Sequence, residues 1–91
     1  MTGQLYINYT QDVGLNQSGS LVIGPKTGEN IGIDNNEIMA RNNSAASTLY
    51  INSEGGNVYI GSGGITSVGT ITSSAGYLKS TLNGNTIQIG S

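Results

Sequence analysis

Aliphatic residues alternate with other residues in short groups along this chain, and each group ends in a turn-forming residue. A group consists of an aliphatic residue, any residue, a second aliphatic residue, and then Gly, Asn or Asp. Alternation with a period of two predicts a β-strand, and Gly, Asn and Asp accept the backbone conformations that turns require. Strands are therefore predicted at residues 5–8, 21–24, 31–34, 49–52, 58–61 and 87–90.

The spacing of the strand groups favours an all-β fold without significant helix. Weaker groups begin at Val13 and Ile38, so that most groups follow one another after seven to eleven residues. That spacing is too short for alternating strands and helices. The stretch Ser44–Ser47 is the only one with helix-favouring residues, and four residues cannot nucleate a stable helix. A short strand repeated in this way predicts a quasi-linear β-structure.

The composition predicts that several copies of the chain are needed to build a core. Only 23 of the 91 residues are Ile, Leu, Val or Met, and Trp, Phe and Cys are absent. Small chains of this kind often depend on oligomerisation. The favoured fold is an elongated, intertwined homotrimeric β-helix or β-spiral fibre of short strands and Gly/Asn turns. A small monomeric or dimeric β-sandwich and a single-chain solenoid are the alternatives.

The first and third residues of each group share one face of the strand. These aliphatic residues are predicted to line the axis of the trimer, where copies from three chains form a continuous apolar column. The middle residues, among them Tyr6, Tyr50 and Tyr59, are predicted to face outward, and Gly24 and Gly56, with Gly61, to make turns. The predicted trimer core is Leu21, Ile23, Ile31, Ile33, Ile38, Leu49, Ile51, Val58, Ile60, Ile87 and Ile89.

Charge and hydropathy argue against several partners. The net charge is −2, and the three cations, Lys26, Arg41 and Lys79, are scattered singly. Binding to a phosphate backbone needs clustered cations, so no nucleic-acid partner is expected. No apolar run has the length of a membrane span and no signal peptide is visible, so neither membrane insertion nor standard secretion is expected.

The residues offer little catalytic chemistry. Without His or Cys, the chain cannot form a Ser-His-Asp triad, a Cys-His pair or a zinc site of these ligands. Asp34 and Glu37, with Glu29 before them, could form a carboxylate pair or bind a cation. The favoured interpretation makes Asp34 a turn residue and pairs Glu37 with Arg41 or Lys26. No catalytic, cofactor-binding or metal residue is predicted, and no cofactor.

Two of the tyrosines could have a binding role. Tyr50 and Tyr59 could pack at seams between chains or contact a saccharide at the surface. Arg41 is expected to donate hydrogen bonds to another chain or to solvent.

Residues 21–61 resemble a segment of tail-fibre, baseplate and other structural proteins of tailed bacteriophages. Ile31–Arg41 has the form Ile-x-Ile-Asp-x-Asn-Glu-Ile-x-Ala-Arg, and Leu49–Gly61 has the form Leu-x-Ile-Asn-x-x-Gly-Gly-x-Val-x-Ile-Gly. The resemblance implies a homotrimeric β-helical shaft on the virion, synthesised in the bacterial cytoplasm. Its implied partners are other copies of the chain, other virion proteins and a host cell-wall saccharide.

The expected function is therefore structural and not enzymatic. Residues 1–20 are expected to be an N-terminal strand and attachment segment, residues 21–61 a repetitive β shaft, and residues 62–91 a Gly/Ser/Thr-rich continuation of that shaft. The shaft would project from a tail, baseplate or head fibre towards the host. Two alternatives are the shaft of a polysaccharide-degrading fibre and a carbohydrate-binding adhesion module.

Overall fold

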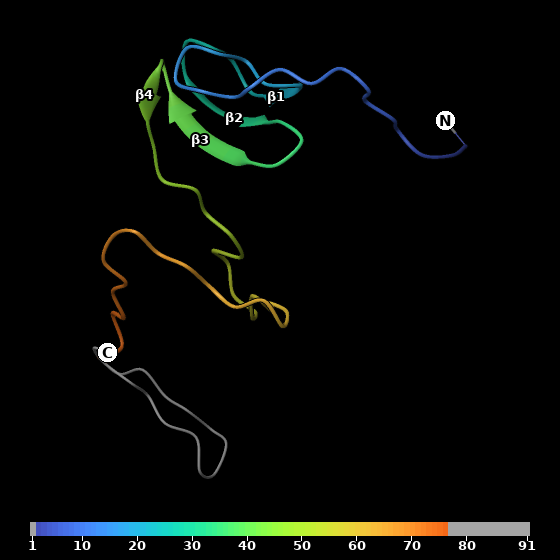
Figure 1. Ribbon diagram of the computed structural model, residues 1–91. Coiled ribbons are helices and arrows are strands. Elements are labelled where there is room, and N and C mark those ends of the chain that lie inside the picture. Colours follow the sequence, from blue (N-terminus) through green and yellow to red (C-terminus); the bar gives the residue numbers. More distant parts are fainter. Residues whose placement is uncertain (1, 77–91) are drawn as a thin grey trace. The chain divides into compact units, whose positions relative to one another are not determined.

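The computed structural model describes residues 2–76, and its regular structure is one antiparallel sheet. The strands lie in chain order as β1 (Leu21–Ile23), β2 (Glu29–Ile33), β3 (Ile38–Asn42) and β4 (Ala45–Ala46) (Figure 1). None of the described residues is helical. The all-β class predicted from the alternation is thus confirmed for this part of the chain.

Each connection between strands has a local cause. Between β1 and β2, Gly24 has a φ of +105°, and a Cβ there would lie 2.5 Å from the carbonyl oxygen of Glu29, so only glycine fits. Between β2 and β3, Asp34 Oδ1 accepts hydrogen bonds from the backbone N–H of Asn36 and of Glu37, both at 2.9 Å. This is the Asx turn that Asp favours.

The connection between β3 and β4 is a two-residue hairpin. Asn43 and Ser44 have φ values of 48° and 64°, and Asn42 pairs with Ala45 across the turn. Two central residues with positive φ form the type I′ geometry that matches the twist of a hairpin, and Asn accepts it readily. The helix-favouring Ser44–Ser47 stretch therefore contributes β4 and not a helix.

The strand register divides the side chains between two faces. Leu21 pairs with Ile33, Ile23 with Ile31, Ile31 with Ala40, and Ile33 with Ile38. Directly paired residues lie on the same face of a sheet. We call this set the aliphatic face: Leu21, Ile23, Ile31, Ile33, Ile38 and Ala40. The pair Glu29 and Asn42 lies on the same face, at the end of β2 and β3. The opposite set is the covered face: Val22, Asn30, Gly32, Met39 and Arg41.

The segment before β1 lies over the covered face. Val13 and Ser18 form an isolated antiparallel bridge that closes a small loop, and Gly14 N–H donates to the carbonyl of Gln17 at 3.1 Å. Val13 is 4% exposed and is the only buried hydrophobic side chain in the described chain. A Cβ on Gly32 would clash with Val13 Cγ2, which shows that the loop presses directly on β2. The small core of this unit therefore lies between the loop and the sheet.

Three predicted strands are not strands in this chain. Residues 5–9, 47–52 and 58–60 have no strand assignment, although their aliphatic residues alternate as predicted. Leu49–Ile51 and Val58–Ile60 make no backbone hydrogen bond to any described residue. Alternation favours an extended segment, but a strand forms only when a second strand supplies the hydrogen bonds. Within the described chain no such partner is available to them, and the predicted strand at 87–90 lies outside the described residues.

The chain divides into two compact units, Met1–Val58 and Tyr59–Ser91. The first contains the sheet and its covering loop. The described part of the second is a succession of turns without strands, such as Gly64 N–H to the carbonyl of Gly61 and Gly76 N–H to the carbonyl of Ser73. The expected functional segments 1–20, 21–61 and 62–91 stay a prediction, because compact units and functional segments need not coincide.

Candidate functional site

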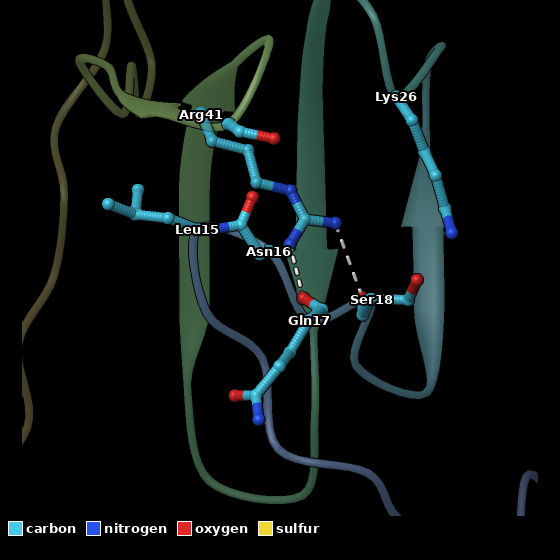
Figure 2. Close-up of a pocket in the computed structure, with 7 residues that line it drawn as sticks. Leu15, Asn16, Gln17, Ser18, Lys26 and Arg41 are labelled. Atoms are coloured by element: carbon cyan, nitrogen blue, oxygen red, sulfur yellow. Dashed lines mark hydrogen bonds between the residues drawn. The ribbon is translucent and has the colours of Figure 1, made fainter.

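The guanidinium of Arg41 is the centre of the polar interior. Arg41 belongs to β3 and is 4% exposed. Its side chain crosses the covered face towards the loop before β1 (Figure 2). Its Nε donates to Asn30 Oδ1, its Nη1 to the carbonyls of Gly14 and Gln17, and its Nη2 to the carbonyl of Ser18 at 3.3 Å. A planar fork of donors suits this arrangement, which a lysine could not reproduce.

Asn30 extends this network to the first turn. Its Nδ2 donates to the carbonyls of Pro25 and Gly28, both at 3.0 Å, while its Oδ1 accepts from Arg41. Among the described residues, no buried side-chain nitrogen or oxygen lacks a partner. Arg41 and Asn30 together therefore fix the loop and the β1–β2 turn to the sheet.

This position of Arg41 differs from the sequence expectation. Arg41 was expected to face another chain or solvent, yet its donors serve carbonyls of its own chain. A small cavity of about 80 Å³ beside it is lined by Lys26, Leu15 and Ser44 among others. The guanidinium already donates to four acceptors of its own chain. Its role in this structure is therefore to stabilise the packing of the loop on the sheet.

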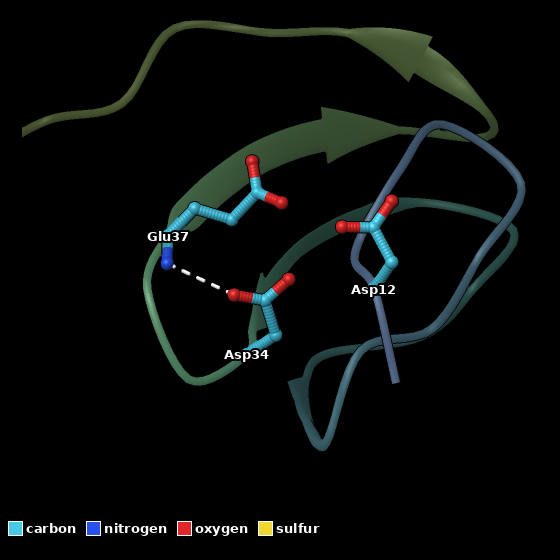
Figure 3. Close-up of side chains that lie close together, drawn as sticks. All are labelled: Asp12, Asp34 and Glu37. Atoms are coloured by element: carbon cyan, nitrogen blue, oxygen red, sulfur yellow. Dashed lines mark hydrogen bonds between the residues drawn. The ribbon is translucent and has the colours of Figure 1, made fainter. Parts of the chain in front are cut away.

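Three carboxylates meet at the edge of the same unit. Asp12, Asp34 and Glu37 each bring an oxygen to within 4.8 Å of the others (Figure 3). Asp34 Oδ2 also accepts from the backbone N–H of Val13 at 2.9 Å, which ties the loop to the β2–β3 turn. Asp34 is the predicted turn residue. The predicted pairing of Glu37 with Arg41 or Lys26 is wrong, because Glu37 lies among acids and Arg41 is engaged elsewhere.

The cluster could in principle accept a cation, since carboxylate oxygens are the ligands of hard cations. Calcium takes six to eight oxygens, whereas this cluster offers three carboxylates, and the oxygens of Asp34 already accept three backbone N–H groups. Glu29, the third acid named from the sequence, does not belong to the cluster. The arrangement of Asp34 is accounted for by the turn alone.

The environment shifts the pKa values of two of these acids in opposite directions. The backbone N–H of Asn36, followed by that of Val13, lowers the pKa of Asp34 below its ordinary 3.8 because these bonds favour the carboxylate. The hydrogen bond with Asp34, then partial desolvation and the nearby negative charges, raises the pKa of Glu37 above its ordinary 4.5. As the pH falls, Glu37 therefore takes up a proton before Asp34 does.

The free energy of unfolding of the sheet unit is expected to be highest near pH 4. The lowered pKa of Asp34 means that its contribution is present above 3.8 and is lost as the pH falls through the folded-state pKa. The raised pKa of Glu37 means that stability falls as the pH rises from 4.5 through the folded-state pKa. Glu37→Gln should therefore be more stable than the wild type at pH 7, by a small amount because both acids are in contact with solvent.

Urea unfolding followed by circular dichroism at pH 3, 4.5 and 7 tests this prediction. Glu54→Gln is the matched control, because it removes one negative charge at an exposed position outside the cluster. Equal stabilisation by Glu37→Gln and Glu54→Gln would show that only the net charge of the chain matters. It would contradict a cause in the contacts of Glu37 with the other acids of the cluster.

Three tyrosines that were predicted to face outward lie at the surface of the single chain, as do the aliphatic residues beside Tyr50 and Tyr59. Tyr6, Tyr50 and Tyr59 are all exposed, Tyr59 to 92%. Tyr50 borders a groove of about 240 Å³ whose other lining residues include Glu29 and Thr48. Tyr59 is not among the residues that line this groove. Saccharide contact by Tyr50 and Tyr59 stays a prediction.

Most of the predicted trimer-core residues are exposed in the single chain. Ile31 and Ile33 are half-buried. The exposed members are Leu21, Ile23, Ile38, Leu49, Ile51, Val58 and Ile60. Ile87 and Ile89 lie outside the described residues. Nothing in a single chain tests whether these residues meet at an axis, so the trimer core stays a prediction.

Sequence reasoning missed two members of these clusters. Asp12 lies 22 residues from Asp34, and no spacing signal connects them. Val13 begins a group weaker than the others, yet it forms the buried core. One signal in the sequence could have pointed to this polar interior. Asn30, Gly32 and Arg41 alternate with aliphatic residues, so that a polar side chain, a charged side chain and a glycine all lie on one face.

The chain matches no protein-family model, no curated protein and no solved structure in the comparisons made with it. Among the described residues there is also no helix of the length and apolar character that a membrane crossing requires. The class that the structure defines is that of a small all-β chain with a four-stranded antiparallel sheet.

Proposed function

We propose that this chain is a structural segment of a bacteriophage fibre, a shaft built from three copies of the chain. The observation that carries the proposal is the number of large apolar side chains that the described residues leave exposed, among them Ile23, Ile38 and Ile51. Val13 is the only buried hydrophobic side chain among these residues. Burying the exposed side chains against other copies of the chain would be favourable.

The chemistry of the exposed surface supports association over solvation. The exposed residues include aliphatic pairs with regular spacing, Leu49 with Ile51 and Val58 with Ile60, in segments whose backbone groups lack partners in the described chain. Such segments supply the backbone hydrogen bonds and the apolar side chains that pairing with another chain requires. The resemblance of residues 21–61 to phage fibre and baseplate proteins supports the virion as the location.

The function that follows is mechanical. A trimer of paired strands would resist unfolding and proteolysis while projecting a distal element from the particle towards the host surface. A tail, a baseplate or a head fibre would each use such a shaft, with other virion proteins at its ends. The open groove beside Tyr50 leaves saccharide contact as an additional property of the same shaft.

Light scattering coupled to size exclusion should give a mass of three chains, that is, three times the single-chain 9.3 kDa. Ile51→Asp is expected to reduce the mass to that of one chain, because it would bring unpaired carboxylates together at the axis. Ile51 is exposed in the single chain, so the substitution leaves the sheet unit intact. A wild-type protein that remains a single chain at high concentration would overturn the proposal.

A further inference from the structure

The buried guanidinium of Arg41 has no carboxylate partner among the described residues. Its four acceptors are the carbonyl oxygens of Gly14, Gln17 and Ser18 and the side-chain oxygen of Asn30, all of which are neutral. An arginine that is only 4% exposed is rarely found without a paired negative charge. The described residues therefore satisfy most of its hydrogen bonds but supply no counter-charge.

One N–H group of this guanidinium also has no acceptor among the described residues. A guanidinium carries five N–H donors, one on Nε and two on each terminal nitrogen. In Arg41, Nε donates once and Nη1 twice, whereas Nη2 makes a single bond, to the carbonyl of Ser18 at 3.3 Å. A further acceptor at Nη2 would complete the set.

A second cation borders the space beside Arg41. Lys26 and Arg41 line the same cavity of about 80 Å³, together with Ser18 and Ser44 (Figure 2). They are the only lysine and arginine in residues 2–76, and no acid lines the cavity. The ammonium of Lys26 makes no hydrogen bond or ion pair with any described residue. It is therefore available to a ligand.

The size and the lining of the cavity fit a small oxyanion. Its volume is well above the roughly 10–15 Å³ that admits a single water, so a group of several atoms has room. Besides the two cations, the lining offers the hydroxyls of Ser18 and Ser44 and the side-chain amides of Asn16 and Gln17. Charged and polar donors of this kind bind the oxygens of phosphates and carboxylates.

We propose that this cavity binds a small oxyanion, a phosphate or carboxylate group, which provides the counter-charge for the buried guanidinium. Nη2 of Arg41 and the ammonium of Lys26 would donate to its oxygens. Lys26 lies between β1 and β2, Ser18 in the loop before β1, and Ser44 in the hairpin between β3 and β4. A bound anion would thus connect three separate turns of the sheet unit. The site lies within one chain and does not depend on the proposed trimer.

Titration of the full chain with inorganic phosphate tests the proposal, with the ionic strength held constant by sodium chloride and the backbone amides followed by NMR. The amides of residues 15–18, 26 and 44 should shift and reach saturation. Lys26→Met should weaken binding at least about tenfold, the ratio that 1.4 kcal/mol gives, because it removes one of the two cations. Lys26 is exposed and outside the hydrogen-bond network of Arg41, so the sheet unit should stay folded in this variant.

The matched control separates the site from the overall charge. Lys26→Met combined with Glu54→Gln has the wild-type net charge of −2, and Glu54 does not line the cavity. This double variant should bind phosphate as weakly as Lys26→Met alone. Recovery of wild-type affinity in the double variant would show attraction by net charge only, and would refute the site.

Two further outcomes complete the test. Acetate, titrated in the same way, shows whether the site accepts a carboxylate as well as a phosphate, and saturable binding of either anion that Lys26→Met weakens supports the proposal. Shifts that rise linearly with concentration, or that are equal in the wild type and Lys26→Met for both anions, would refute it. Neither result changes the mass of the protein in solution, so failure of this site and failure of the proposed fibre function are distinguishable.

Discussion

Arg41→Met is expected to lower the free energy of unfolding of the sheet unit by about 3 kcal/mol, the largest loss from any single side chain in this unit. Removing the guanidinium leaves the carbonyls of Gly14 and Gln17 and the Oδ1 of Asn30 without their donors. Each buried acceptor left unpaired costs about 1–3 kcal/mol. Methionine keeps an aliphatic stem in place, so the loss reports the hydrogen bonds more than the packing.

Arg41→Lys is the informative companion variant. It keeps the charge but cannot reach acceptors on three sides at once, so it should recover less than half of the lost stability. Hydrogen exchange of the β2 and β3 amides, measured by NMR, follows the sheet unit separately from the rest of the chain. Lys26→Met is the control, because Lys26 is exposed on the β1–β2 turn. Exchange in Arg41→Met that equals exchange in Lys26→Met would show that the network does not hold the fold.

The sequence predicted the strands and turns of the sheet better than it predicted which segment would pack over the sheet. The alternation at Ile31–Ile33, the turn at Gly24 and the Asx turn at Asp34 all follow from the chemistry of a few adjacent residues, and all are present. The segment that covers one face of the sheet did not follow, because alternation shows which residues share a face but not which face another segment will cover. Here the cover is the loop that begins at Val13, a segment with a weak hydrophobic signal.

The missing strands have a related explanation. Residues 49–51 and 58–60 have the same alternation as residues 31–33, yet only the last are a strand. Residues 31–33 find β1 and β3 nearby in the chain, connected by short turns. The other two groups have no such neighbours among the described residues. Strand propensity does not explain the difference, because the two groups that are not strands have Tyr at the position of Gly32, and Tyr favours strands more than Gly does. The availability of a partner determined the outcome.

Arg41 shows the same principle for a charged residue. A single cation in a strand group suggests exposure, since Arg is rarely fully buried without partners. Its burial here depends on four acceptors, of which three are backbone carbonyls in a loop 23 to 27 residues away. Carbonyls have no sequence signature. The site could therefore be recognised only from the alignment of Arg41 with Asn30 and Gly32 on one face.

Gly32→Ala is expected to destabilise the sheet unit by about 2 kcal/mol, the second largest effect, through overpacking alone. The new Cβ would clash with Val13 Cγ2 and lie 3.0 Å from Arg41 Nη2. The φ of Gly32 is not among the positive values, so alanine adopts the strand conformation there without strain. In most strands a glycine weakens the structure, whereas here the missing side chain is what allows the loop and the guanidinium to reach β2.

A second substitution separates the clash from any other cause. Val13→Ala removes the Cγ2 atom, so Gly32→Ala should cost less in the Val13→Ala background than in the wild type. The double variant should then lose less stability than the sum of the two single variants. Gly28→Ala is the matched control, because its Cβ would meet only Pro25 Cγ, at 3.4 Å. Stability is again measured by exchange of the β2 and β3 amides. Additive effects of Val13→Ala and Gly32→Ala would contradict direct contact between the loop and the strand, and with it the assignment of this face to the interior of the chain.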